Sequence, residues 1–219
     1  MQLGITIIII IITCIVSFTA LSNQKIINDL IFTPPLVAQQ GQWYRFFSCG
    51  LIHADFGHLL FNMLTLYFFG PAVERGFEDI FGAGLGRWVY LLMYVTALAV
   101  SVVPTYQRHK NNWDYRSLGA SGAVSAVLFA GLLIAPSTGV GIFFIPIPIP
   151  GFIFAPLYLL LSAWLDRRGG DNINHSAHIW GALYGLAFVI VGGYAVGYPV
   201  ITNAIEEIKF YMRINGWIN

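Results

Sequence analysis

The stretch AHIWGALYG at residues 177–185 combines two features that decide how we expect the chain to fold. Gly181 and Gly185 stand four residues apart in an apolar segment, and this GxxxG pattern lets two membrane helices approach closely. His178 precedes Gly181 by three residues, so it falls on the same helical stripe as the glycines. Because an ionisable side chain is costly in an apolar segment, it is a functional candidate. The stretch therefore predicts a close-packed membrane helix with a functional histidine.

A second small-residue motif, GASG at residues 119–122, opens another apolar segment and offers a partner for the first. Gly119 and Gly122 would allow a neighbouring helix to come close. Ser121 falls in the first turn of the predicted helix, where free N–H groups and the helix dipole favour developing negative charge. A serine hydroxyl facing a histidine is the arrangement of a nucleophile and its general base. We therefore expect Ser121 and His178 to form a dyad.

His58 and Asn62 mark the start of a third apolar segment. They are four residues apart, so both point from one face of a helix. A neutral imidazole N–H and an amide NH₂ are donors of the kind that line an oxyanion hole. In the simpler interpretation, the two side chains satisfy each other or a loop carbonyl.

The composition is that of an integral membrane protein. Of the 219 residues, 57% are apolar and 10% are Asp, Glu, Lys or Arg, whereas soluble domains carry about 25% charged residues. The net charge of +1 and the absence of a basic run argue against a nucleic-acid partner. The two cysteines have no CxxC spacing, so the sequence predicts neither a disulfide framework nor a thiolate metal site.

Six apolar segments predict an all-α membrane protein, a six-transmembrane-helix bundle that forms one domain over residues 1–219. A helix needs about 20 apolar residues to cross a bilayer. The expected helices are 3–22, 58–76, 87–105, 118–135, 152–165 and 175–197. The connector 142–151 alternates proline with isoleucine, which forbids a helix and predicts an extended segment at the membrane surface.

Taken together, these motifs resemble the rhomboid family of intramembrane serine proteases. The match consists of Gly-x-Ser-Gly at 119–122, His-x-x-x-Asn at 58–62 and Ala-His-x-x-Gly-x-x-x-Gly at 177–185, with a Tyr-Arg pair at 44–45 in the first loop. Each motif alone is weak. Their order and spacing across six helices make the combination specific, and it covers essentially the whole chain.

The resemblance implies an endopeptidase that hydrolyses peptide bonds in or near transmembrane segments through an acyl-enzyme intermediate. By this resemblance Ser121 is the nucleophile and His178 the base, while His58, Asn62 and the Ser121 backbone N–H line the oxyanion hole. Structural support is expected from small residues in two helices and from two charged residues. These are Gly119, Gly122, Gly181, Gly185, Arg45 and Glu74.

The chain departs from the family pattern at two places. The family often has tryptophan directly before the arginine of the first loop, whereas here Tyr44 precedes Arg45 and Trp43 comes one residue earlier. Some members stack a tyrosine under the histidine ring from one turn below the serine, and here that position is Ser125. Support for His178 is therefore expected from elsewhere.

The expected partners are the lipid bilayer and transmembrane protein substrates. Helix-destabilising residues in the substrate, such as Gly and Pro, would ease the local unwinding that exposes a peptide bond. No metal or other cofactor and no nucleic acid is expected. The predicted location is a multi-pass position in a prokaryotic cell membrane or inner membrane.

The orientation implied by the family places the N-terminus in the cytoplasm and opens the active site to the other side. The positive-inside rule predicts the reverse, because the side with the termini carries four basic residues and the other side seven. The first group is Arg75, Arg87, Lys209 and Arg213; the second is Lys25, Arg45, Arg108, Lys110, Arg116, Arg167 and Arg168.

Three alternatives belong to other functional classes. A catalytically silent rhomboid-like protein would bind membrane helices without cutting them, although such proteins usually lack the serine or the histidine. A metal-dependent enzyme or metal transporter would use His53, His58, His175 and His178, but the chain has no HExxH motif, and Glu74, the acidic residue in a predicted helix, stands at the far end of that helix from His58. A channel or transporter usually shows internal repeats or charges within several helices, and neither is evident.

Overall fold

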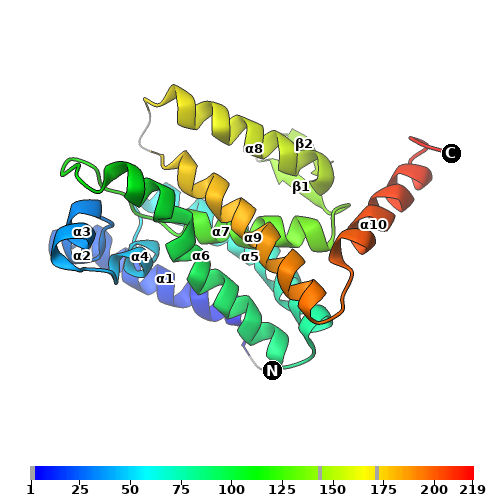
Figure 1. Cartoon of the computed structure of the whole chain (residues 1–219), viewed down its shortest axis with the longest axis horizontal. Coiled ribbons are helices and arrows are strands. Elements are labelled where there is room, and N and C mark those ends of the chain that lie inside the picture. Colours follow the sequence, from blue (N-terminus) through cyan, green and yellow to red (C-terminus); the bar gives the residue numbers. More distant parts are fainter. Residues whose placement is uncertain (1–2, 143–144, 171–172) are drawn as a thin grey trace.

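Helices make up most of the chain in the computed structural model, which describes residues 3–142, 145–170 and 173–219 (Figure 1). The N-terminal half of the chain contains α1 (Ile5–Leu21), α2 (Gln24–Leu30), α3 (Pro34–Gln40), α4 (Arg45–Ser48), the 3₁₀ turn η1 (Cys49–Leu51), α5 (Phe56–Phe81) and α6 (Leu85–His109). The C-terminal half contains α7 (Ser121–Ile134), β1 (Gly139–Ile142), β2 (Ile145–Pro150), α8 (Gly151–Arg168), α9 (His175–Ala195) and α10 (Val200–Ile214).

Three of these helices, α5, α6 and α9, are long and apolar enough to cross a membrane, and α1 and α7 are shorter apolar helices. Each of the six predicted segments overlaps a helix, but the ends differ. The predicted helix 58–76 continues through Pro71 to Phe81 as α5, and the predicted helix 152–165 runs to Arg168 as α8. Polar residues near the ends hid these last turns in the sequence.

Helix α7 forms the centre of the bundle, where it contacts α5, α6 and α9. Every residue from Gly122 to Ala130 is buried. The beginnings of α5, α7 and α9 lie at the same end of the bundle as the ends of α6 and α8, because hydrogen bonds and an ion pair join them there. This end contains the predicted site residues.

The proline-rich connector forms a two-stranded antiparallel hairpin, in which Gly139 pairs with Pro150 and Val140 with Ile149. Part of the predicted extended segment 142–151, residues 143 and 144, lies outside the described residues. The backbone is extended on both sides of them, as the alternating prolines require. Helix α8 begins directly after Pro150.

Helix α10 was not predicted from the sequence. It leaves the bundle after α9 (Figure 1), and its buried side is small, consisting of Val200 and Ala204. Glu207 accepts hydrogen bonds from the main-chain N–H of Ser137, at 3.1 Å, and from its hydroxyl. Because polar residues interrupt its apolar positions, the hydropathy of this segment does not resemble that of a spanning helix.

Candidate active site

The structure brings together the two residues of the predicted dyad. Oγ of Ser121 lies 2.8 Å from Nε2 of His178. Ser121 is the first residue of α7, and His178 lies in the first turn of α9. Both side chains are partly buried, so the hydroxyl and the ring meet just inside one end of the bundle.

Glycines that follow the two dyad residues along α7 and α9 explain why these helices approach so closely. A Cβ built on Gly181 would lie 2.0 Å from the carbonyl oxygen of Gly122, and one on Gly185 would lie 2.2 Å from that of Ala126. A Cβ on Gly122 would itself collide with Ser101, at 2.2 Å from Oγ. The backbones of α7 and α9 are therefore in direct contact, which sets the separation of Ser121 and His178.

The chain is fixed at each residue before Ser121. The N–H of Gly119 donates to the carbonyl of Cys49 at 2.9 Å, and the N–H of Ala120 donates to Nε2 of His53 at 3.3 Å. Gly119 has a φ of +115°, which L side chains rarely adopt. A Cβ there would also lie 2.6 Å from Cε1 of His58, so glycine is required twice over.

His53 is fully buried behind this loop. The hydroxyl of Ser17 donates to the carbonyl of Leu51 at 2.8 Å, so it accepts a hydrogen bond from Nδ1–H of His53, 2.9 Å away. Nε2 then carries a lone pair, as the N–H of Ala120 requires. Burial lowers the pKa of His53 to about 3, which keeps the ring neutral. The sequence offered His53 as a metal ligand in one alternative and otherwise as a residue that hydrogen-bonds a loop, but it did not identify the serine loop as the partner.

His58 and Asn62, both in the first two turns of α5, make different contacts. Asp55 caps α5 by accepting from the N–H of His58 at 2.8 Å, and the His58 ring lies against Gly119. Asn62 is buried, and its Nδ2 donates to the main-chain carbonyl of His58 at 2.9 Å. This bond uses one amide N–H of Asn62, and the amide has a second.

The first turn of α7 supplies further donors to the site. The first helical hydrogen bond of α7 runs from the N–H of Val124 to the carbonyl of Ala120, at 2.9 Å. The N–H groups of Ser121, Gly122 and Ala123 therefore precede the regular hydrogen-bond ladder and face the open end of the helix. They form the positive end of the helix dipole beside the Ser121 hydroxyl.

Arg45 holds the first loop together from inside. Its side chain is 4% exposed. Nη1 donates to the carbonyls of Asn28, at 3.0 Å, and Ile31, at 2.6 Å, while Nε donates to Oε1 of Gln42 at 2.7 Å. In this loop Trp43 stacks on Phe46, with ring centroids 5.9 Å apart. Trp43 therefore packs against the first loop, although it stands two residues before Arg45 and not directly before it.

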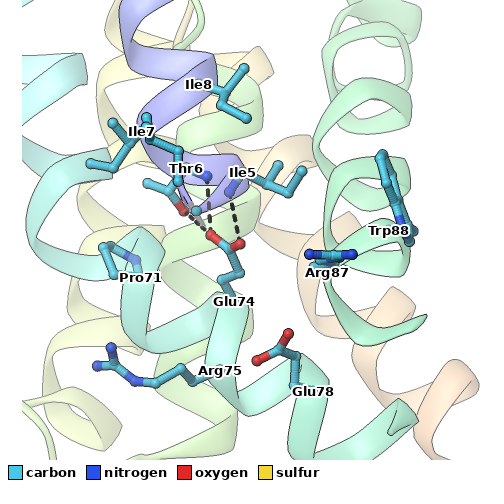
Figure 2. A pocket seen from close by; sticks show the side chains of 12 residues that line it. Ile5, Thr6, Ile7, Ile8, Pro71, Glu74, Arg75, Glu78, Arg87 and Trp88 are labelled. Atoms are coloured by element: carbon cyan, nitrogen blue, oxygen red, sulfur yellow. Dashed lines mark hydrogen bonds between the residues drawn. The ribbon is translucent and has the colours of Figure 1, made fainter. Parts of the chain in front are cut away.

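Glu74 lies at the opposite end of the bundle, where it caps α1. It accepts from the N–H groups of Ile5, at 2.7 Å, and Thr6, at 3.0 Å, and from the Thr6 hydroxyl at 3.0 Å. Figure 2 shows these bonds at the wall of a cavity of about 610 Å³, which Glu78 and Arg87 also line. Glu74 thus ties α5 to the beginning of α1.

Two other side chains, Tyr158 and His175, contact Ser125 and His178 respectively. The Ser125 hydroxyl lies 3.3 Å from the hydroxyl of Tyr158, which comes from α8. The ring of His175 meets that of His178 edge to face, with centroids 5.8 Å apart. The sequence placed His175 and His178 on one helix face, whereas it did not identify Tyr158 as the neighbour of Ser125.

The four histidines considered as metal ligands form two ring pairs. His53 and His58 have centroids 4.9 Å apart, and His175 and His178 form the second pair. In the part of the chain that the structure describes, no three His, Cys, Asp or Glu side chains converge as a metal site requires.

Comparison with known proteins assigns the chain to a family. The model of the rhomboid domain matches residues 40–195, which include Ser121, His178, His58, Asn62 and His53. The chain belongs to the rhomboid family. This rhomboid is an integral membrane protein with several candidate spans.

Similar proteins occur in a bacterium and a plant. This rhomboid is 30% identical over 174 residues to the candidate rhomboid protease YdcA of Bacillus subtilis, which covers 75% of each chain. It is 32% identical over 154 residues to rhomboid protease GluP of the same bacterium, and the matched region covers 67% of this chain and 25% of GluP. It is 28% identical to the mitochondrial RHOMBOID-like protein 12 of Arabidopsis thaliana over 66% of this chain and 45% of that one. The chain thus spans less than half the length of two of these relatives.

Proposed function

We propose that this rhomboid is an intramembrane serine endopeptidase, which cuts peptide bonds in or near the transmembrane segments of other membrane proteins. Oγ of Ser121 attacks the scissile carbonyl while Nε2 of His178 accepts the hydroxyl proton. The tetrahedral intermediate collapses to an acyl-enzyme as His178 gives that proton to the leaving amine. Water, deprotonated by His178, then releases the acid and restores Ser121.

The observation that carries this proposal is the 2.8 Å separation between Oγ of Ser121 and Nε2 of His178. A general base must lie about 2.6–3.2 Å from the atom whose proton it takes. The same pair lies at the first turn of α7, where a negatively charged oxygen is favoured by the helix dipole. A serine and a histidine brought together only for packing would not need this location.

The oxyanion hole is proposed to consist of the Ser121 N–H, the His58 ring and the Asn62 amide. The contact of the His58 ring with Gly119 supports its inclusion, because it places the ring within two residues of Ser121. For Asn62 the support is its second N–H and its place one turn along the same helix face. Donors already in place can each contribute about 3 kcal/mol to the transition state.

We also propose that α1, α5, α6, α7, α8 and α9 form six membrane spans in one domain over residues 1–219. We propose the family's orientation as well, with a cytoplasmic N-terminus. Of the seven basic residues on the active-site side, Arg45 is buried in the first loop, where it holds the loop together and does not act as a free loop charge. The remaining six face four on the other side, so the proposed orientation rests on the family and not on the positive-inside rule.

The proposed substrates are transmembrane proteins whose helices contain weak helix formers. A peptide bond in a helix is shielded by its own hydrogen bonds, so it must unwind before Ser121 can reach the carbonyl. Gly and Pro lower the cost of unwinding by about 1 and 3 kcal/mol per residue relative to Ala. The bilayer presents these helices to the site laterally.

The test is cleavage of a single-span model substrate in liposomes by the wild type, Ser121→Ala and His178→Ala. We expect each variant to lose at least about 100-fold in kcat while it keeps the wild-type Tm. A fluorophosphonate probe should label the wild type and not Ser121→Ala. Wild-type protein that binds transmembrane peptides but neither cuts them nor takes the probe would instead indicate a catalytically silent rhomboid.

A further inference from the structure

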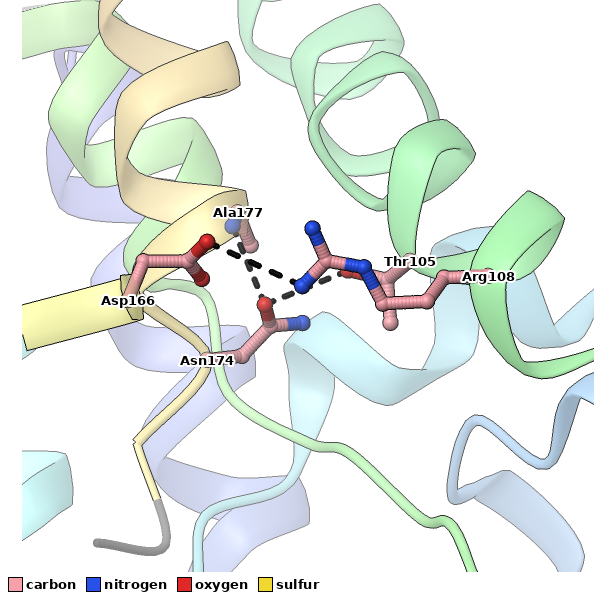
Figure 3. Close-up of polar contacts among 5 residues, drawn as sticks. All are labelled: Thr105, Arg108, Asp166, Asn174 and Ala177. Carbon is pink, nitrogen blue, oxygen red and sulfur yellow. Dashed lines mark hydrogen bonds and ion pairs between the residues drawn. The ribbon is translucent and has the colours of Figure 1, made fainter. Parts of the chain in front are cut away.

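We propose that Asn174 is a positioning residue that sets the geometry between Ser121 and His178, a role that rests on the proposed function. Asn174 directly precedes α9 and is not part of the motifs quoted above. Its side chain lies between three segments at the open end of the bundle. Figure 3 shows it between the end of α6, the end of α8 and the beginning of α9.

The amide oxygen of Asn174 faces two helices. Oδ1 accepts from the N–H of Ala177 at 3.1 Å, which caps the turn of α9 that carries His178. It also accepts from the hydroxyl of Thr105, at 3.2 Å, near the end of α6. The start of α9 is thereby held against α6 as well as capped.

The amide nitrogen of Asn174 faces the serine loop. Nδ2 donates to Oγ of Ser117 at 3.2 Å. The orientation of the amide is determined by chemistry, because the Ala177 N–H can only donate and so must face the oxygen. Ser117 is itself fixed to the first loop, since its backbone and that of Phe32 exchange hydrogen bonds of 2.9 and 3.0 Å.

The bond between Asn174 and Ser117 joins two residues that stand at the same distance along the chain before the two dyad residues. Ser117 stands four residues before Ser121, and Asn174 stands four residues before His178. The bond between Asn174 and Ser117 therefore joins the two segments on which the dyad is built, on the open side of the dyad. The contact of Gly181 with Gly122 joins the same two helices on the buried side.

A contact on both sides is needed because the dyad tolerates little movement. The glycine contact fixes the separation of α7 and α9, but the loop before Ser121 and the first turn of α9 can still shift beyond it. A misplacement of about 1 Å can cost on the order of 100-fold in rate. A hydrogen bond between the two leading segments restricts that shift, and an amide can make it while also capping α9.

The neighbouring ion pair between Arg108 and Asp166 does not have this role. The Arg108 side chain is 62% exposed and lies 3.7 Å from Asp166, so the pair is a surface contact of α6 with α8. Exposed pairs contribute little to stability and are screened by salt. Of the contacts drawn in Figure 3, those of Asn174 connect the start of α9 to the rest of the site.

The test compares Ser117→Ala with Thr105→Ala, because each removes one hydrogen bond to the same Asn174 side chain. Only Ser117 lies on the segment that leads to Ser121. We expect Ser117→Ala to lower kcat and the rate of fluorophosphonate labelling by about 10-fold with KM unchanged. We expect Thr105→Ala to change both by less than about 2-fold, while Ser117→Thr, which keeps a hydroxyl, recovers most of the rate. All assays are run well below the Tm of each variant.

Asn174→Ala should lose both the cap and the link, so it should lower Tm and reduce kcat by about 10- to 100-fold. Equal rates for Ser117→Ala and Thr105→Ala would overturn the proposal, as would an Asn174→Ala variant with lowered Tm and an unchanged labelling rate. These results presuppose that the wild type takes the probe. A wild type that neither takes the probe nor cleaves would overturn the proposed function, and with it this role for Asn174.

Discussion

The main-chain N–H of Ala120 donates a hydrogen bond to Nε2 of His53, so a buried histidine from the end of the first loop holds the residue directly before Ser121. Two oxygens on the other side of the ring fix its tautomer, because the Ser17 hydroxyl is already committed to the carbonyl of Leu51. These hydrogen bonds therefore require His53 to be neutral, with its proton on Nδ1.

Replacement of His53 by alanine should destabilise the protein. The Ala120 N–H would be left buried without its acceptor, which costs about 1–3 kcal/mol, and the lost ring leaves a cavity. Glutamine is the matched control, because its Oε1 can replace Nε2 as the acceptor. We expect a lower Tm for His53→Ala than for His53→Gln, measured by thermal unfolding in detergent; equal Tm values would contradict the role of the Ala120 bond.

The same residue predicts a dependence of stability on pH. Burial lowers the pKa of His53 to about 3 in the folded protein, whereas an unfolded histidine titrates near 6.5. Between these values the unfolded chain binds a proton that the folded chain does not, so the free energy of unfolding falls as the pH falls from about 6.5 towards 3. His53→Gln removes this contribution. The wild type should therefore lose more stability than the variant between pH 7 and pH 4, and parallel curves would contradict the assignment.

Glu74 provides a prediction at the end of the bundle far from the dyad. Its carboxylate accepts two main-chain N–H groups at the start of α1, and an amide offers one oxygen in place of two (Figure 2). We expect Glu74→Gln to lower the free energy of unfolding by about 1–3 kcal/mol with kcat within about 2-fold of the wild type.

Glu78→Gln serves as the control for Glu74→Gln, because Glu78 lines the same cavity without capping α1. Chemical denaturation monitored by tryptophan fluorescence would compare the two variants. If Glu78→Gln lost as much free energy of unfolding as Glu74→Gln, the negative charge in the cavity would be the source of the stability, and the cap of α1 would not be.

The sequence could predict the Ser121–His178 pair because both residues stand beside glycines on apolar helices, where close packing leaves few arrangements. It could not predict the role of His53, because the bond to Ala120 joins a loop to a loop 67 residues later. The contact of Tyr158 with Ser125 was equally hidden, since it depends on how α8 lies on α7. Helix α10 was missed because its buried face is only a few residues wide and its remaining positions mix polar and apolar side chains.

The contact of Gly181 with Gly122 yields the most direct prediction about the geometry of the dyad. A methyl group on Gly181 would lie 2.0 Å from the carbonyl oxygen of Gly122, so the two helices must separate in Gly181→Ala. Overpacking of this kind costs about 1–3 kcal/mol. The hydrogen bond of 2.8 Å between Ser121 and His178 cannot survive a separation of the helix ends, so kcat should fall by at least about 10-fold.

Gly141→Ala is the matched control for Gly181→Ala, because a Cβ on Gly141 meets nothing within 4 Å and its φ is not in the left-handed region. Substrate cleavage and fluorophosphonate labelling would be measured for both variants at a temperature where each is folded. The two rates should fall together in Gly181→Ala, since both depend on the activated Ser121 hydroxyl. A Gly181→Ala variant that labels at the wild-type rate would mean that α7 and α9 can repack without moving the dyad, and that the glycine contact serves stability alone.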